Sequence, residues 1–247
     1  MSHNQLDKFL RLLKASPSGA VFNPWWQIDE QNDIGPHSPA IRRKHLAAYF
    51  RERLGKVRVV IIGEALGYRG GHFSGIPMTS ERILLGKQPA IAAALSERRN
   101  RKPNSKNSGH HGKPARQILS GLRPRRTSKP SVCADGFSEP TATIVWGALL
   151  KTGVPPNEFV LWNAFPWHSF DPRRGLLSNR APDKSEQLCG RAVLKAFLEL
   201  FPCETIVSLG KIAAAQLEQL GVKGQCVRHP ASGGAKLFRQ QIAGIIR

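Results

Sequence analysis

Three stretches of the sequence place polar side chains where an apolar run ends. The stretch "VRVVIIGEA" ends at Gly63, Glu64 and Ala65, "EFVLWNAF" carries Asn163 near its end, and "GQCVRHP" reaches His229. A carboxamide offers one donor side and one acceptor side, an imidazole nitrogen can donate a hydrogen bond, and a carboxylate can accept a proton. These side-chain types could bind a polar ligand and stabilise charge that develops as it reacts.

The apolar runs themselves predict the fold. They are short and rich in β-branched residues, as is typical of strands buried on both faces, and a fourth run, "ETIVSLG", leads to Gly210 and Lys211. Helical segments lie between the runs, so we expect an α/β fold with three α/β/α layers and a four-stranded parallel sheet. Ligands of such sheets bind outside the carboxyl ends of the strands, where these polar residues would meet.

Capping residues predict where several helices begin and end. Ser38 as N-cap and Pro39 at the first helical position should open a helix over residues 38–55, and Gly221 should close one that begins at residue 211. We also expect helices over residues 5–15 and 186–201, and a short helical piece over residues 114–122.

Length and charge indicate one domain with a polyanionic partner. The 247 residues fit a single domain, residues 1–247, that carries an insertion at about residues 97–131. The 37 Lys and Arg against 17 Asp and Glu give a net charge of +20, whereas a magnitude of about 2–8 is usual for a small domain. Nucleic acid is the first candidate partner and a membrane surface the second. The sequence shows no basic amphipathic helix and no apolar run of about 18 residues, which counts against the membrane.

The insertion is strongly basic throughout. Residues 98–129 contain eleven Lys or Arg and no Asp or Glu, and their Pro, Gly, Ser and Asn content favours a mobile or partly disordered segment. A solvated surface would explain such a run, but its single sign of charge favours contact with phosphates. The candidate DNA-binding residues here are Arg123, Arg125 and Arg126.

Cysteine spacing and glycine motifs argue against a cofactor. Cys133, Cys189, Cys203 and Cys226 are scattered without a C-x-x-C pair, which favours reduced thiols over a disulfide framework or a metal site. "GEALGY" lacks both the dinucleotide-binding fingerprint and the P-loop, so a nucleotide-handling enzyme has no phosphate motif. We expect no metal and no cofactor.

In their order and at these strand ends, "GEALGYRGGHFSGIPMTSER", "VLWNAFPWH" and "VRHPASGGAKLF" resemble the motifs of the uracil-DNA glycosylase superfamily. The resemblance covers residues 57–82, 159–186 and 205–239. It is strongest to bacterial branches whose first motif begins Gly-Glu-Ala-Pro-Gly, and "SNRAPDKSE" is similar to an Asn-Arg-x-Pro stretch found there. It implies an uracil-DNA glycosylase-like fold and release of a damaged base from DNA.

The resemblance implies two central roles. Cleavage of an N-glycosidic bond leaves a cationic sugar and a base anion, so a donor must stand where negative charge develops. His229 matches the family histidine that donates to uracil O2, and Asn163 matches the asparagine that pairs with O4 and N3–H, a pattern that cytosine does not offer. A plain His-Pro turn and an Asn that caps local backbone are the structural alternatives.

The rest of the base pocket departs from the family pattern. Met78 stands where an aromatic residue usually covers the base, so Phe73 or Phe165 would have to supply an aromatic face, although Phe165 is equally compatible with the core. Gly67 stands where a tyrosine blocks the thymine methyl in the best-known branch. We expect broader base tolerance, or exclusion of the methyl by Tyr68. The base-binding set also includes the backbone at Gly63 and Ala65.

The residue that positions the attacking water is open. The best-known branch begins Gly-Gln-Asp-Pro-Tyr and uses its Asp, but this chain has Ala65 at that place. Glu64 and Glu81 are the replacement candidates, the latter because a sister branch carries an acid at the matching position. Either could instead be structural: Glu64 by binding backbone N–H groups, Glu81 by its favourable place at a helix start.

The loop after His229 is the expected contact with the DNA strand. In the family this loop enters the minor groove; here Ser232, Gly233 and Gly234 would meet phosphate, and Leu237 would act as a wedge. The same residues could begin a C-terminal helix in which Leu237 and Phe238 belong to the core.

These expectations combine into one function and two rivals. We expect a monofunctional, metal-independent glycosylase that removes uracil, and other deaminated bases, from DNA. We place it as a monomer in the bacterial cytoplasm, associated with the nucleoid. A non-catalytic nucleic-acid-binding protein on the same fold is the main alternative. The cysteines do not match the spacing of the branch that binds an iron–sulfur cluster, and His110 and His111 lack the surrounding motif of a relative that traps DNA covalently.

Overall fold

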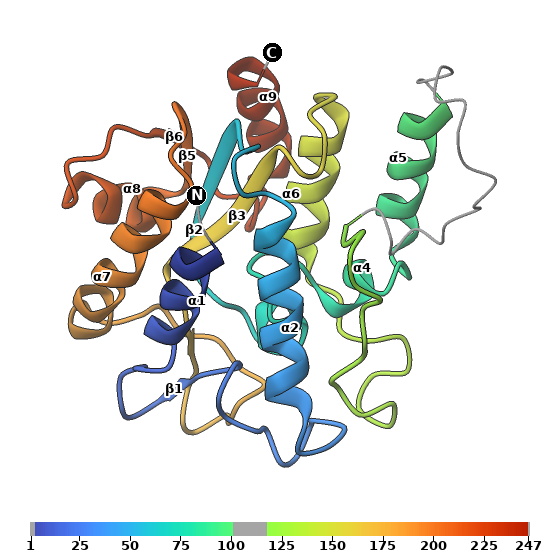
Figure 1. Ribbon diagram of the computed structural model, residues 1–247, viewed down its shortest axis with the longest axis vertical. Helices are drawn as coiled ribbons and strands as arrows, with labels where there is room; N and C mark the ends of the chain where they lie inside the picture. Colours follow the sequence, from blue (N-terminus) through green and yellow to red (C-terminus); the bar gives the residue numbers. More distant parts are fainter. Residues whose placement is uncertain (1–2, 101–117, 247) are drawn as a thin grey trace.

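A parallel four-stranded sheet forms the centre of the computed structural model, which describes residues 3–100 and 118–246 (Figure 1). The order is β3-β2-β5-β6, and all three neighbouring pairs are parallel. The strands are β2 (Val59–Ala65), β3 (Phe159–Phe165), β5 (Thr205–Leu209) and β6 (Gln225–Val227). The predicted α/β fold class with a four-stranded parallel sheet is confirmed.

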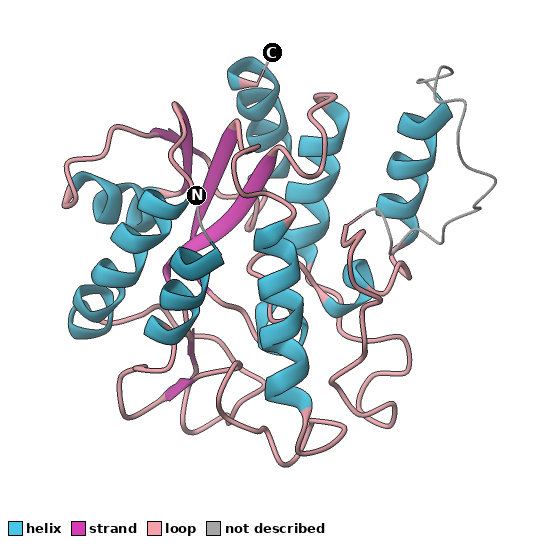
Figure 2. Cartoon of the chain, viewed as in Figure 1, coloured by secondary structure: helices cyan, strands magenta, loops and turns pink. Residues whose placement is uncertain are grey.

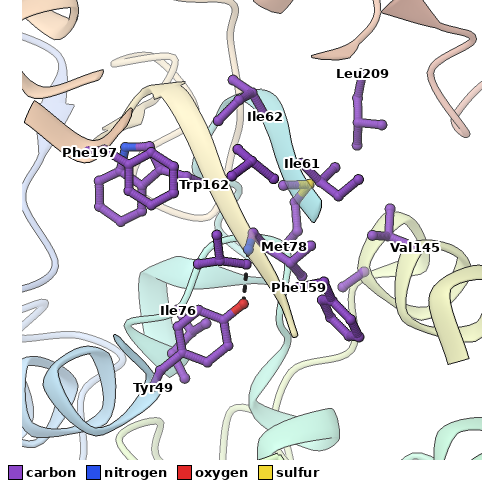
Figure 3. Packing of buried hydrophobic residues seen from close by; sticks show 14 of the residues in the cluster. Tyr49, Ile61, Ile62, Ile76, Met78, Val145, Phe159, Trp162, Phe197 and Leu209 are labelled. Carbon is purple, nitrogen blue, oxygen red and sulfur yellow. Dashed lines mark hydrogen bonds between the residues drawn. The ribbon is translucent and has the colours of Figure 1, made fainter. Parts of the chain in front are cut away.

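Side chains that alternate along β3 make both faces of the sheet apolar, and helices cover both faces. Trp162 stacks on Phe197 at 5.1 Å and meets Phe9 and Phe50 edge-on or tilted, each at 5.4 Å. On the other face, Phe159 packs against Trp146 at 5.0 Å. Figure 3 shows Trp162 and Phe197 on one side of β3 and Phe159 on the other. This alternation produces the expected three layers.

The first face is covered by α1 (His3–Leu12), α2 (Ser38–Arg51), α7 (Lys184–Leu200) and α8 (Lys211–Glu218), and the second by α6 (Pro140–Lys151) and α9 (Ala235–Ile245). The shorter helices α3 (Gly71–Ser74) and α4 (Glu81–Leu84) follow β2, and α5 (Pro89–Asn100) leads into the segment outside the described residues. None of the described helices is long and apolar enough to span a bilayer.

Two predictions about helices need correction, and one is confirmed. Ser38 lies inside α2, with His37 as N-cap, because the Ser38 hydroxyl donates to the Thr127 carbonyl at 3.4 Å instead of capping. The helix that begins at residue 211 ends at Glu218, and Gly221, with φ 69°, closes its last turn as predicted. The Gly221 N–H donates to the Glu218 carbonyl and the Val222 N–H to the Leu217 carbonyl. Residues 118–122 are irregular, while the remainder of the expected piece lies outside the described residues.

A small second sheet stands beyond the carboxyl ends of the central strands. There β1 (Val21–Phe22) pairs antiparallel with β4 (His168–Ser169), among the loops gathered at the lower end of the view in Figure 2. His72 lies 3.1 Å from Asp29 Oδ2 through Nε2, and 3.1 Å from His168 Nδ1 through Nδ1. These contacts are buried, and they hold the segment that follows β2 against the loop at Asp29 and against β4.

Two buried histidines should make stability depend on pH. His45 Nε2 accepts from the Arg125 N–H and His168 Nε2 faces the Ser178 carbonyl at 2.7 Å, so each neutral ring uses both nitrogens. Burial lowers the pKa of His45 to about 4, and burial followed by the charge of His72 lowers that of His168 to about 3. Below pH 6.5 the unfolded chain therefore takes up protons that the folded chain refuses. The free energy of unfolding is therefore highest above pH 6.5. Below that pH it falls by about 1.4 kcal/mol per pH unit for each histidine.

Urea unfolding between pH 8 and 4.5 measures this slope. His45→Gln should reduce the slope of the unfolding free energy against pH by about 1.4 kcal/mol per pH unit, the contribution of one histidine. His37→Gln, at an exposed histidine, should leave this slope unchanged. An unfolding free energy that stays constant between pH 6.5 and 4.5 would contradict the prediction.

Candidate functional site

A pocket of about 390 Å³ opens at the carboxyl edge of the sheet. Seven of the predicted site residues line it, from three strand ends and the loop after β2. They are Gly63, Glu64, Ala65, Gly67, Met78, Asn163 and His229. The prediction that these distant segments meet at one edge of the sheet is confirmed by the lining. Its size suits a small planar ligand or one nucleotide unit.

Asn163 is the most unusual residue of the pocket. It lies near the end of β3, opposite Gly63 of β2, and is 1% exposed. Neither Nδ2 nor Oδ1 has a hydrogen-bond partner among the described residues. A buried unpaired carboxamide costs about 1–3 kcal/mol per group, so the arrangement weakens the fold. It also argues against the alternative in which Asn163 caps local backbone.

Gly63 makes room for this side chain. A β-carbon at Gly63 would lie 2.5 Å from Asn163 Oδ1 and 3.2 Å from Met78 Sδ, closer than packed atoms allow. The glycine is therefore needed for space. Met78 holds a left-handed backbone with φ 47°, uncommon for a residue other than glycine, and its buried thioether lies beside Ile61 of β2 (Figure 3).

His229 presents a single defined donor. Its Nδ1 accepts a hydrogen bond from the Ala231 N–H at 3.1 Å, so the neutral ring carries its proton on Nε2. Burial lowers the pKa of His229, and the charge of Arg228 adds to this effect. The neutral form with an Nε2–H donor therefore prevails at neutral pH. The Gly234 position lies so near the His229 carbonyl that only glycine fits there.

Three predicted base-contacting residues do not line the pocket. Phe165 is 1% exposed and packs edge-on against Trp167 at 5.3 Å, so it belongs to the core. Phe73 is fully buried and stacks on Phe137 at 4.4 Å. Tyr68 turns toward Phe137 and accepts from Arg69 at 2.8 Å. The aromatic face expected beside Met78 is therefore supplied by neither Phe73 nor Phe165.

Glu81 has a structural place, which corrects its candidacy as catalytic acid or base. It is 0% exposed, and Oε1 accepts from the Thr127 and Ser128 N–H groups at 2.7 and 3.1 Å. Oε2 accepts from the Ser128 hydroxyl. These bonds fasten residues 127–128 to the start of α4. The carboxylate therefore has its hydrogen-bonding positions filled, and Glu81 does not line the pocket.

Glu81→Gln should therefore reduce stability and spare catalysis. A charged acceptor contributes about 1.5–3 kcal/mol per hydrogen bond, and the amide replaces one acceptor oxygen with a donor that faces other donors. We expect the free energy of unfolding to fall by about 2–3 kcal/mol, with base release per folded molecule changed less than about threefold. Chemical denaturation and single-turnover kinetics measure both. Glu158→Gln, at an exposed ion pair, is the control. A rate loss of about 100-fold at unchanged stability would restore a catalytic role.

The structure adds four residues with polar side chains to the predicted pocket residues. They are Glu139, Thr141, Asn179 and Arg180. Asn179 Oδ1 accepts from the Tyr68 N–H at 3.0 Å, and Arg180 pairs with the Glu186 carboxylate. The "SNRAPDKSE" resemblance pointed toward the last two, whereas nothing in the sequence signalled Glu139.

The space next to Gly67 is also filled differently than expected. A β-carbon at Gly67 would lie 2.8 Å from Glu139 Oε1. The Glu139 carboxylate therefore occupies the space next to Gly67, so a Gly67→Tyr side chain could enter only if this carboxylate moved. The broader base range stays a prediction.

The predicted DNA-contacting loop is partly exposed. Ser232, with φ 50°, and Gly233, with φ 79°, form an exposed left-handed turn. Gly234 is buried and its N–H donates to the Ala231 carbonyl, so that N–H is not available for phosphate. In α9, Leu237 is 48% exposed while Phe238 is fully buried. Phe238 is therefore a core residue of a C-terminal helix, whereas Leu237 is exposed and free to act as a wedge.

The basic insertion is described only at its two ends, residues 97–100 and 118–131. Arg123 and Arg125 are exposed, whereas the Arg126 guanidinium donates to the carbonyls of Ser128 and Ala134 and to others of this loop. Arg126 therefore holds the loop together, which corrects its assignment as a phosphate contact. His110 and His111 lie outside the described residues. The four cysteines are free thiols, and the described residues contain no group of His, Cys, Asp and Glu that could hold a metal ion.

No protein-family model matches the sequence, and no curated protein matches it. Among solved structures, the chain is similar to the crystal structure of wild-type SMUG2 from Pedobacter heparinus, with a TM-score of 0.55 and 14% sequence identity. The match covers 97% of this chain and 95% of that one. Over nearly its whole length, this chain therefore has the uracil-DNA glycosylase-like α/β fold.

Proposed function

We propose that this protein is a monofunctional DNA glycosylase that flips uracil, and other deaminated bases, out of DNA and hydrolyses the N-glycosidic bond. The observation that carries this proposal is Asn163, a buried carboxamide whose donor and acceptor are both unpaired in an open pocket. A uracil edge offers O4 to the donor and N3–H to the acceptor, and so satisfies both groups at once. The fold shared with SMUG2 and the charge of +20 support DNA as the partner.

The chemistry needs a donor for the leaving base, and His229 fits that need. Its Nε2–H is fixed by the bond that Ala231 makes to Nδ1, so no proton has to move before the reaction. A neutral imidazole donates to the oxygen on which negative charge develops, and stabilises the transition state more than the bound substrate. Extrusion of the base from the duplex brings it to this pocket.

Exposed residues beside His229 suit contact with the strand that carries the flipped base. Arg228 and Ser232 flank His229 on the exposed loop, and Leu237 projects from the first turn of α9. Backbone and hydroxyl contacts of this kind position a strand without reading its sequence. Glu64, half-buried in the pocket with its pKa raised by burial, is one acidic group available for the attacking water.

Incubation with a labelled duplex that contains one uracil, followed by alkali, tests the proposal. Strand cleavage that occurs only after alkali means an abasic product and a monofunctional glycosylase. A parallel duplex with hypoxanthine measures the base range, and an undamaged duplex is the control. Tight, salt-sensitive binding with an intact strand would instead mean that the protein only binds nucleic acid.

A further inference from the structure

The pocket holds a carboxyl group that the motifs do not account for. Glu139 directly precedes α6, at the N-cap position, yet its side chain makes no capping hydrogen bond. It turns toward the loop after β2, where Oε1 lies against Gly67 and Oε2 against Gly70. The carboxyl group thus accepts no hydrogen bond from the backbone N–H groups of the first helical turn, as an N-cap side chain usually does, and points to the pocket instead.

The surroundings of Glu139 are built to admit this side chain. A β-carbon at Gly67 would lie 2.8 Å from Oε1, and one at Gly70 would lie closer still to Oε2. Neither glycine has the positive φ that would otherwise call for glycine. The two glycines thus leave space that this one carboxyl group fills.

That carboxyl group has no structural partner to explain it. Oε2 is buried and lacks a hydrogen bond among the described residues. Glu81 shows the contrast, since its two oxygens accept three hydrogen bonds. An unpaired acidic oxygen destabilises the fold, and such groups gather where a reaction uses them.

We propose that Glu139 is a catalytic residue that accepts a proton from the water that attacks the sugar. This inference rests on the glycosylase function proposed above and names a residue that function does not require. The water oxygen forms a bond to C1′ as the bond from C1′ to the base nitrogen breaks. The electron pair leaves with the base, whose anion is held by His229 Nε2–H, and one water proton passes to the Glu139 carboxylate. Solvent later takes that proton and protonates the base.

The acidity of Glu139 suits this role near neutral pH. Burial raises the pKa of Glu139 to about 7, and a general base works best when its pKa lies near the working pH. The base form is the carboxylate, so the rate should fall about tenfold per pH unit below about 7. Other charged groups of the pocket are Glu64, whose pKa burial raises, His229, whose pKa is lowered, and Arg180, a cation paired with Glu186.

Single-turnover base release from a uracil duplex, measured from pH 5.5 to 9 with enzyme in excess, tests the inference. Glu139→Gln should lower the plateau rate about 100-fold and abolish the break near pH 7. Glu139→Asp, which keeps the carboxylate, should be slower than the wild type but retain a break. Glu199→Gln, an exposed acid on α7, should match the wild type. Circular dichroism and duplex affinity show that each variant is folded and binds DNA.

The outcomes separate the inference from the proposed function. Rapid release by the wild type with a Glu139→Gln rate within about threefold of it overturns the role of Glu139 and leaves the glycosylase intact. A break near pH 7 that persists in Glu139→Gln and disappears in Glu64→Gln assigns the proton to Glu64 and also overturns it. No base release by the wild type, despite binding, overturns the proposed function and this inference with it.

Discussion

Replacement of His229 by alanine should lower the rate of uracil release about 10³-fold, while the affinity for a uracil duplex changes less than about fivefold. A donor that meets charge as it develops contributes about 3–4 kcal/mol to the transition state and little to the ground state. The Ala231 N–H occupies Nδ1, which leaves the proton of the neutral ring on Nε2, and His229 lines the pocket. Alanine removes the donor without disturbing the strand ends.

The measurement is a single-turnover rate under saturating enzyme, which separates chemistry from binding and product release. His37→Ala, at an exposed histidine outside the pocket, is the matched control and should react like the wild type. Lowering the pH should also slow the wild type once His229 becomes protonated, which happens below its ordinary value of 6.5 because burial lowers the pKa. A His229→Ala rate within tenfold of the wild type would show that the histidine is only part of a turn.

The strand-end residues could be predicted because their signal is local. The apolar composition of residues 159–165 predicts a buried strand. Parallel strands bring their carboxyl ends to one edge of the sheet, independent of the conformation of the loops. Asn163 and His229 were therefore placed in one pocket without any knowledge of contacts. Met78 was expected there for another reason, its position in the motif that resembles the uracil-DNA glycosylase superfamily, and it lines the pocket.

The residues that were misplaced or missed depend on contacts between distant segments. Glu81 satisfies its charge with Thr127 and Ser128, which lie 46 and 47 residues further along the chain. Glu139 reaches the pocket from the start of α6, and only the space beside Gly67 and Gly70 admits it. The sequence shows Gly67 and Gly70, but not the carboxyl group that fills the space beside them.

The pocket concentrates groups that work against folding. Asn163 and Glu139 both bury polar atoms without partners, whereas the buried Arg42 pairs with Asp33 at 2.5 Å and Glu81 is fully bonded. Paired buried charges hold the loops beyond the sheet in place. The unpaired polar groups of Asn163 and Glu139 therefore remain fixed in position. A site prepared in this way loses little order when a ligand binds. It also predicts that some site mutations stabilise the protein.

Asn163→Leu is the sharpest form of that prediction. Leucine is close to asparagine in shape and removes both unpaired polar atoms, so we expect the free energy of unfolding to rise by about 1–2 kcal/mol. The same change removes the donor and the acceptor that read the base edge, and uracil release should fall at least about 10³-fold, since sites built on hydrogen bonds lose strongly when these are absent. Stability and catalysis would thus move in opposite directions.

Ser208→Ala provides the matched control. Its hydroxyl is also buried and unpaired, but it lies on β5 outside the pocket lining, so alanine should raise stability slightly and leave base release unchanged. Denaturant unfolding and single-turnover release on the three proteins give both quantities. If Asn163→Leu instead lowered stability by more than about 1 kcal/mol, the carboxamide would be holding the fold together. Its two free groups could then no longer be assigned to a base.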